Sequence, residues 1–115
     1  MAATAAGLRP DAVGSPQAIR HEIARLHTEL APARSLLDAT VAKLRRGESV
    51  QNEACMLKAL LPELVNRVTY KCVQFHGGGG FVLGGIVERL ARDTRFLAIG
   101  GGSTEVMLDE IAKRL

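Results

Sequence analysis

The chain has 115 residues and a formal net charge of +3; hydrophobic residues make up 47% of it and aromatic residues only 3%. This length allows one domain at most, and the composition predicts an aliphatic core built from helices. The basic residues are interleaved with acidic ones and lack neighbouring aromatic side chains, which argues against nucleic-acid binding. No apolar run approaches the roughly 18–20 residues of a membrane span, and the start of the chain is a poor secretion signal. We therefore expect a cytoplasmic protein.

Residues 1–15 are rich in alanine, glycine and proline and are expected to form a flexible arm, ahead of a helical domain over residues 16–115. A long helix is predicted from Pro16, with Ser15 as its N-cap, and Gly47 suits its end. Its apolar residues recur at spacings of three and four, which indicates one continuous buried stripe. The stripe consists of Ile19, Ile23, Leu26, Leu30, Ala33, Leu37, Val41 and Leu44.

A second long helix is predicted over Gln51–Phe75, terminated by Gly77. The short link at residues 46–49 makes the two long helices antiparallel neighbours. Pro32 and Pro62 fall inside these helices, where each either kinks its helix or divides it in two, and the sustained apolar spacing favours kinks. The second stripe consists of Leu57, Leu60, Leu61, Leu64, Val68, Cys72 and Phe75.

Two short helices complete the pattern, one over about residues 85–96 and one over about residues 104–114. Ser103 is the expected N-cap of the last helix, and Glu105 lies where a helix dipole favours an acid. The predicted fold is all-α, an antiparallel helical bundle of two long helices with two short C-terminal helices laid against them. The short helices are expected to bury Ile86, Val87, Leu90 and Phe96, and Val106, Met107, Ile111 and Leu115.

Glycines cluster at Gly77–Gly80 and Gly100–Gly102, on either side of the third predicted helix. Consecutive glycines before a helix expose backbone amides to a phosphate group, and the helix dipole assists such binding. No Lys-Ser or Lys-Thr pair accompanies the clusters and no strand precedes them, so neither a P-loop nor a dinucleotide-binding fold is indicated. Helix ends and flexible corners remain the simpler explanation of both clusters.

Few other residues suggest chemistry. Cys55 and Cys72 are separated by 17 positions on one predicted helix, which places them about 25 Å apart and too far for a disulfide. His21, His27 and His76 show no metal-ligand spacing, and no serine or cysteine has a neighbouring base. The residues on their own predict a helical domain with one candidate anion-binding turn and no assigned activity.

Three motifs follow one another in the C-terminal part of the chain, QFHGGGGF at 74–81, VERLARDTR at 87–95 and GSTE at 102–105. Their order closely resembles the C-terminal end of the acyl-CoA dehydrogenase family. An earlier segment, QAIRH at 17–21, resembles the start of a helix in the same family. The resemblance therefore extends over roughly residues 17–115 and covers the helical C-terminal domain only.

This resemblance implies a flavoprotein context. Members of the family bind FAD, oxidise the α,β bond of acyl-CoA thioesters and pass electrons to an electron-transfer flavoprotein. Their C-terminal domain builds the oligomer and contacts the FAD of a neighbouring subunit. The resemblance implies a homo-oligomer or a larger acyl-CoA dehydrogenase subunit as partner, and FAD contacts at Gln17, Gln74, Phe75, His76, Gly77, Gly78, Ser103, Thr104 and Glu105.

The chain also departs from the family pattern. Gly101 stands at the usual position of the catalytic base, and it has no side chain to accept a proton. Glu105 is a weak substitute, for which a capping or FAD-contacting role is favoured. Since the β middle domain is also missing, we expect a fragment, a small subunit or a degenerate copy that is not competent alone. The alternative is a non-catalytic helical interaction module; a phosphate-binding nucleotide module is disfavoured because no lysine lies near the turns.

Overall fold

The computed structural model describes residues 15–115, and every regular element among them is helical. The long helices are α2 (Pro16–Arg45) and α3 (Gln51–His76), and the short ones are α4 (Ile86–Arg95) and α5 (Thr104–Ala112). Two 3₁₀ turns, η1 (Gly77–Gly80) and η2 (Phe96–Ala98), follow α3 and α4. The predicted all-α class and the four helices are confirmed. Apart from Ser15, the arm expected at residues 1–15 lies outside the described residues.

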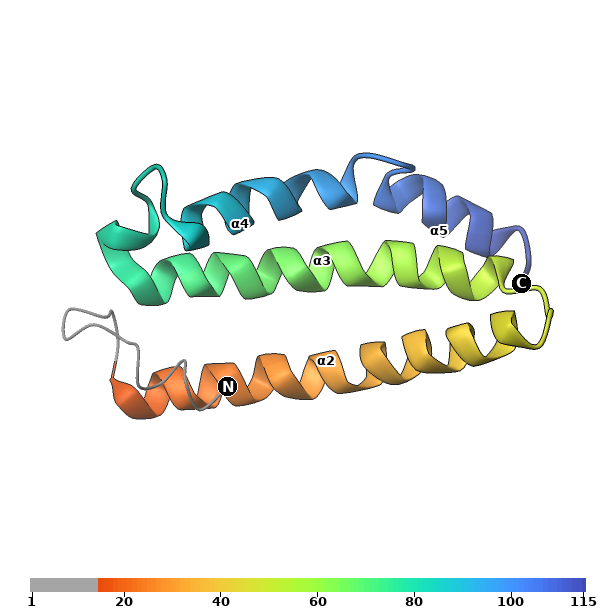
Figure 1. The fold of residues 1–115 in the computed structure, drawn as a ribbon, viewed down its shortest axis with the longest axis horizontal. Coiled ribbons are helices and arrows are strands. Elements are labelled where there is room, and N and C mark those ends of the chain that lie inside the picture. Colours follow the sequence, from red (N-terminus) through yellow and green to blue (C-terminus); the bar gives the residue numbers. More distant parts are fainter. Residues whose placement is uncertain (1–14) are drawn as a thin grey trace.

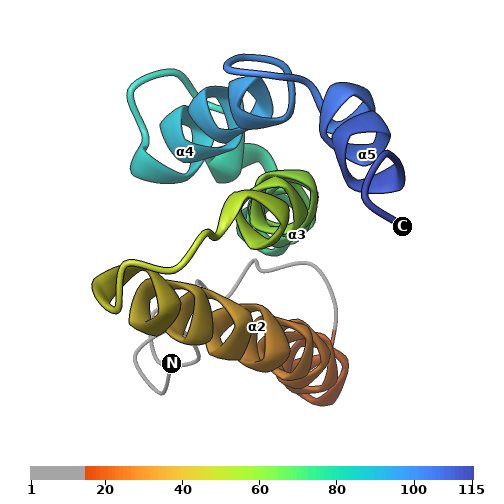
Figure 2. The ribbon, with the colours of Figure 1, turned by 90° about the vertical axis from the view of Figure 1, so that its right-hand side faces the viewer.

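Helix α3 is the centre of the fold. Helix α2 lies along one side of it, and α4 and α5 lie end to end along the other side (Figure 1). Seen along the bundle, α3 separates α2 from both short helices (Figure 2). The short helices therefore pack mainly on the second long helix rather than across the pair.

Three ion pairs define the antiparallel register of α2 and α3. Lys71 Nζ lies 3.2 Å from Glu22 Oε1, and an Arg67 guanidinium nitrogen lies 2.5 Å from Glu29 Oε2. At the other end of the pair, Lys43 binds Glu53. Because the partners run in opposite directions along the two helices, the start of α2 lies beside the end of α3.

The helix ends follow local rules. The Ser15 hydroxyl accepts a hydrogen bond from the Ala18 amide at 3.2 Å, with Pro16 in the first helical position, as predicted. Gly47 adopts a φ of +77° just beyond the end of α2. Pro32 and Pro62 both lie within helices that remain unbroken, so the alternative that one of the two helices is divided into two shorter ones is wrong.

The core is small and aliphatic, and it lies along the α2–α3 seam. The expected α2 stripe is buried only in its first half, since Leu37, Val41 and Leu44 are exposed. Leu60 of α3, also expected inside, is 42% exposed. A helix that packs against one neighbour buries only the line of residues facing that neighbour. The whole apolar stripe would be buried only if a second helix packed against it. The buried hydrophobic residues are Ile19, Leu26, Ala33, Leu57, Ala59, Leu64 and Ala98.

The short helices bury less than their sequences suggest. Val87, Met107 and Ile111 are half-buried as contacts to α3, but the remaining apolar positions face outward. The predicted burial is wrong because α4 and α5 have α3 as their main neighbour within residues 15–115. The exposed positions are Ile86, Leu90, Phe96, Val106 and Leu115.

Candidate functional site

The first predicted contact segment, Gln74–Gly78, closes α3 and enters η1. His76 Nδ1 lies 2.7 Å from the Cys72 carbonyl oxygen; since a carbonyl only accepts, Nδ1 donates and Nε2 is left as an acceptor. Gly77 adopts a φ of +57°, which turns the chain out of the helix. Gln74 and Gly78 are exposed beside this turn. The segment thus presents one side-chain amide, one imidazole and a glycine backbone to the surface.

The four glycines of η1 are not equivalent. Gly80 is buried, and a Cβ added to it would lie 2.8 Å from the Val73 carbonyl oxygen. A Cβ on Gly78 would meet no atom within 4 Å. The run is therefore an ordered turn packed against α3, with glycine required by close approach at Gly80 and open space over Gly78.

The second predicted segment, Ser103–Glu105, begins α5. The Ser103 hydroxyl accepts a hydrogen bond from the Val106 amide at 3.4 Å, which confirms its predicted role as N-cap. Thr104 Oγ1 donates to Glu63 Oε1 at 2.9 Å and so attaches the helix start to the middle of α3. These contacts fix where the first turn of α5 lies.

The Glu105 carboxylate takes part in the same cap. Its own backbone N–H and the Ser103 hydroxyl donate hydrogen bonds to it, and Arg95 adds a nearby positive charge, which together lower the pKa of Glu105 below its ordinary value. An exposed carboxylate held ionised in this way is a poor proton acceptor for a carbon acid. The geometry favours the capping role of Glu105 over the role of substitute base.

The turn before α5 is also closely packed. Gly101 and Gly102 have φ values of +70° and +98°, and a Cβ on Gly100 would lie 2.3 Å from the Phe96 ring. Lys58 Nζ donates to the Leu97 carbonyl oxygen at 2.5 Å. A Cβ at Gly101 would lie 3.9 Å from Lys58 Cε. Among residues 15–115, Lys58 is thus the side chain within 4 Å of the position where the family resemblance implies a base.

Two separate surfaces hold the predicted contact residues. The antiparallel register puts exposed Gln17, near the start of α2, at the same end of the bundle as Gln74. Thr104 is attached to Glu63 instead, which precedes Gln74 by eleven positions, or about 16 Å along α3. Gln17 and Gln74–Gly78 therefore lie at one end of the bundle, and Ser103–Glu105 lie on a separate surface further along α3.

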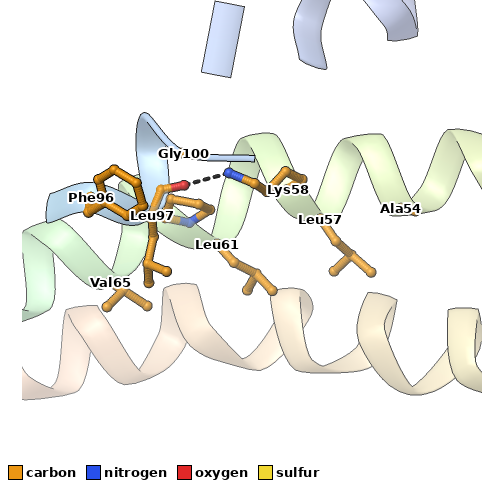
Figure 3. A pocket seen from close by; sticks show the side chains of 9 residues that line it. Ala54, Leu57, Lys58, Leu61, Val65, Phe96, Leu97 and Gly100 are labelled. Carbon is orange, nitrogen blue, oxygen red and sulfur yellow. Dashed lines mark hydrogen bonds between the residues drawn. The ribbon is translucent and has the colours of Figure 1, made fainter. Parts of the chain in front are cut away.

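An apolar hollow of about 490 Å³ lies between α3 and η2 (Figure 3). Leu61 and Val65 of α3, together with Phe96 and Leu97, line it, and Lys58 crosses one edge. Sequence reasoning missed the hollow because it placed Phe96 in the core. The apolar residues Phe96 and Leu97, at the end of the third predicted helix, were the sequence signal for an apolar surface at this place.

The remaining predictions from the sequence concern cysteine pairing, metal binding and membrane-spanning segments. Cys55 and Cys72 are both unpaired, as predicted, and half-buried; burial raises the pKa of the Cys72 thiol. Within residues 15–115, no cluster of three or more histidine, cysteine or acidic side chains is arranged to hold a metal ion. No helix in the same range combines the length and apolar character needed to cross a membrane.

Comparison with known proteins identifies the domain. Residues 3–115 match the family model described as acyl-CoA dehydrogenase, C-terminal domain. A probable acyl-CoA dehydrogenase from Mycobacterium abscessus superposes with a TM-score of 0.84 at 32% identity, covering 97% of this chain and 31% of the other. The resemblance noted in the sequence is therefore confirmed in the fold as well.

Curated relatives show the same partial overlap. The long-chain specific acyl-CoA dehydrogenase of Sus scrofa is 35% identical over 101 residues, which cover 86% of this chain and 23% of that enzyme. A caffeyl-CoA reductase–Etf complex subunit of Acetobacterium woodii is 34% identical over 90 residues, covering 78% of this chain and 24% of that protein. The chain spans about a quarter of the length of these relatives.

Proposed function

The chain belongs to the acyl-CoA dehydrogenase family, and on that premise we propose that it helps to bind FAD and to assemble an acyl-CoA-oxidising flavoprotein. It acts as one part of that enzyme, within a homo-oligomer or beside a larger acyl-CoA dehydrogenase subunit, in the cytoplasm. FAD supplies the redox chemistry of such an enzyme, and this chain supplies contacts to the cofactor and surfaces for assembly.

The separation of the two contact surfaces is the observation that supports this proposal. Gln74–Gly78 closes α3, whereas Thr104 binds Glu63 near the middle of the same helix. An FAD that is shared between two chains can meet one of these surfaces on each chain. The arrangement therefore suits an FAD shared between subunits.

The residues of the α3–η1 turn fit a flavin dinucleotide. Gly78 is exposed, and the space over its Cα is open, so a diphosphate oxygen can approach the backbone there without meeting a side chain. Gln74 offers an exposed amide, and the Nε2 atom of His76 remains an acceptor for a donor group of the cofactor. The Gln74 amide can donate to a phosphate oxygen, whereas the Nε2 acceptor can bind a donor such as a ribose hydroxyl or the adenine amino group.

The exposed apolar surface supports the assembly part of the proposal. Phe81, Val82 and Leu83 are 82%, 63% and 75% exposed, and Ile86 and Leu90 continue the same surface into α4. Contiguous apolar surface of this kind marks an interface in soluble proteins. By analogy with the Etf-complex subunit of Acetobacterium woodii, an electron-transfer flavoprotein is the proposed further partner of the assembled enzyme.

Neither of the two positions that the family resemblance singles out, Gly101 and Glu105, is suited to abstract the substrate proton. Gly101 lacks a side chain, and the pKa of the exposed Glu105 carboxylate is lowered by its own backbone N–H, by the Ser103 hydroxyl and by the charge of Arg95. The base of the assembled enzyme is therefore expected on another chain or segment. These two observations also favour the second candidate, a non-catalytic interaction module of the same fold.

A sizing-column experiment separates the two candidates. The untagged chain is purified from its own host, and flavin absorbance is recorded across the elution. A yellow peak is expected, containing several copies or a second, larger chain. A colourless peak would leave only the interaction module.

Two matched variants connect the flavin to the proposed surface. Gln74→Ala removes an exposed side chain at the flavin-facing end of α3, and Gln51→Ala removes the same side chain at the other end. Flavin retention is expected to fall in the first variant and to stay unchanged in the second. Equal retention in both would contradict the assignment of Gln74–Gly78 to FAD.

A further inference from the structure

A second hollow, which we call the arginine hollow, lies between the C-terminal half of α3 and helix α4. It has a volume of about 510 Å³ and is lined by Thr69, Tyr70 and Val73 of α3 and by Arg92 and Arg95 of α4. This size is within the range of about 300–1,000 Å³ that small-molecule sites occupy. None of these residues belongs to the proposed FAD surfaces, although the positive charge of Arg95 also acts on Glu105.

The floor of the arginine hollow is apolar and firmly placed. Val73 and Ala91 are half-buried there. Thr69 Oγ1 lies 3.3 Å from Thr94 Oγ1 and also donates to the Val65 carbonyl oxygen at 3.0 Å. This contact between the hydroxyl groups joins α3 to α4 beside the hollow, so its two walls are held together by a direct contact.

The rim carries two guanidinium groups one helical turn apart. Arg92 uses its Nε to bind Glu88 Oε1 at 3.3 Å, which leaves its outer N–H donors available, and its side chain is 66% exposed. Arg95 has no carboxylate within 4.0 Å among residues 15–115. Two like charges so close on one helix repel each other, and an anion between them offsets that repulsion.

Tyr70 completes the rim from the opposite helix. It is the only tyrosine in the sequence and is 67% exposed, although a free aromatic ring gains from partial burial. Its ring offers a flat apolar face, and its hydroxyl offers both a donor and an acceptor. The combination of an apolar floor, an aromatic rim and paired guanidinium groups suits a ligand with an apolar body and an anionic end.

We infer that the arginine hollow binds a small organic anion, whose carboxylate or phosphate group lies between Arg92 and Arg95 and whose apolar body rests against Tyr70 and Val73. Guanidinium groups bind such anions through paired, charge-assisted hydrogen bonds. The apolar floor favours a ligand with an apolar part. Inorganic phosphate can bind the two arginines but makes no apolar contact with Tyr70 and Val73.

Titration of the full chain, followed by NMR signals of backbone amides and arginine Nε–H groups, tests this inference. The probes are phenyl phosphate, benzoate, benzyl alcohol and inorganic phosphate, at an ionic strength of about 0.15 M so that exposed charges are screened. Saturable shifts at Arg92, Arg95 and Tyr70 are expected with phenyl phosphate or benzoate, and the stronger of the two identifies the preferred anionic group.

Variants make the test specific. Arg95→Gln is expected to weaken binding about tenfold or more, because it removes a charge-assisted hydrogen bond to the anion. Arg34→Gln, at an exposed arginine of α2, is the matched control and leaves binding unchanged. Equal binding of benzyl alcohol or inorganic phosphate, or unchanged binding in Arg95→Gln, overturns the inference. A failure of the chain to bind flavin would contradict the proposed function but would leave the inference about the arginine hollow unchanged.

Discussion

Thr104 Oγ1 donates a hydrogen bond to Glu63 Oε1 at 2.9 Å, and this contact joins two residues 41 positions apart. It connects the first turn of α5 to the middle of α3, next to the N-cap formed by Ser103. The position of the proposed FAD-contacting segment relative to α3 therefore depends on this exposed hydrogen bond and on the packing of α5 against α3.

Removal of this hydrogen bond is expected to loosen α5 selectively. Thr104→Val keeps the shape of the side chain and removes its donor, so we expect a loss of about 1 kcal/mol in the free energy of unfolding. Hydrogen exchange should accelerate over Thr104–Ala112 while α2 stays protected. Thr28→Val is the matched control, because the Thr28 hydroxyl bonds only to the Ala24 carbonyl of its own helix. Equal effects of the two variants would contradict a specific role for Thr104.

Lys58 is expected to hold the turn between α4 and α5. Its ammonium group donates to the Leu97 carbonyl oxygen across 39 positions of sequence. Lys58→Met keeps most of the aliphatic side chain, and it should speed hydrogen exchange at residues 96–102 and lower stability by about 1 kcal/mol. Lys113→Met, whose parent side chain pairs within α5, should change neither quantity in that segment.

The glycines of η1 should respond very differently to substitution. A Cβ at Gly80 lies 2.8 Å from a backbone oxygen that cannot move without disturbing α3, so Gly80→Ala is expected to cost about 1–3 kcal/mol. Gly78→Ala meets open space and should be close to neutral. Thermal or urea unfolding of the two variants measures the difference. Equal stability of the two variants would mean that η1 is a flexible turn that does not pack closely against α3.

This difference also selects the better probe of cofactor binding. Gly78→Val adds a side chain at an exposed backbone position where a Cβ meets no atom within 4 Å, so a loss of flavin in that variant reports on the cofactor contact. Gly102 is unsuitable for the same purpose, because its φ of +98° and the nearby Met107 side chain make any substitution there disturb the turn.

Stability should fall in acid through the α2–α3 ion pairs. The hydrogen bond from Lys71 lowers the pKa of Glu22 below 4.5, and Lys43 does the same for Glu53. A carboxyl whose folded-state pKa is lowered stabilises the fold fully above its ordinary pKa and loses that contribution as the pH falls through the folded-state pKa.

Urea unfolding at a series of pH values checks this dependence. The free energy of unfolding should decline below about pH 4.5, and the double variant Glu22→Gln with Glu53→Gln should show a shallower decline. Some acid dependence should remain, because the pKa values of Glu105 and Glu110 are lowered as well. If the free energy of unfolding of the double variant declined with pH as steeply as that of the parent chain, the two α2–α3 ion pairs would be excluded as the source of the acid dependence.

Substitutions at two leucines should affect folding and assembly separately. Leu64 is 1% exposed, so Leu64→Ala is expected to cost about 2–5 kcal/mol by leaving a cavity in the core. Leu90 is 46% exposed on the apolar surface of α4, and Leu90→Ser should leave the fold intact and reduce the oligomeric mass. Light scattering and circular dichroism distinguish the two effects. An unchanged mass in Leu90→Ser would remove this residue from the interface.

The fold class and the helix ends could be predicted from the sequence because they depend on nearby residues. The hydrogen bonds of a helix join positions four apart, and the caps at Ser15 and Ser103 reach three positions ahead. The glycine at position 47 ends α2 for an equally local reason, since it adopts a φ of +77°. The motifs that identified the family are also contiguous stretches of sequence.

The sequence by itself determined the four helices, their caps and the family of this protein. Only the tertiary structure decided which apolar faces are covered, since Leu90 and Phe96 have the spacing of buried residues and yet face outward. It also decided that Thr104 meets Glu63 and that Lys58 meets Leu97, and so where the two proposed FAD surfaces lie. Periodicity defines a helix face but not its neighbour, because burial depends on segments brought together from distant parts of the chain.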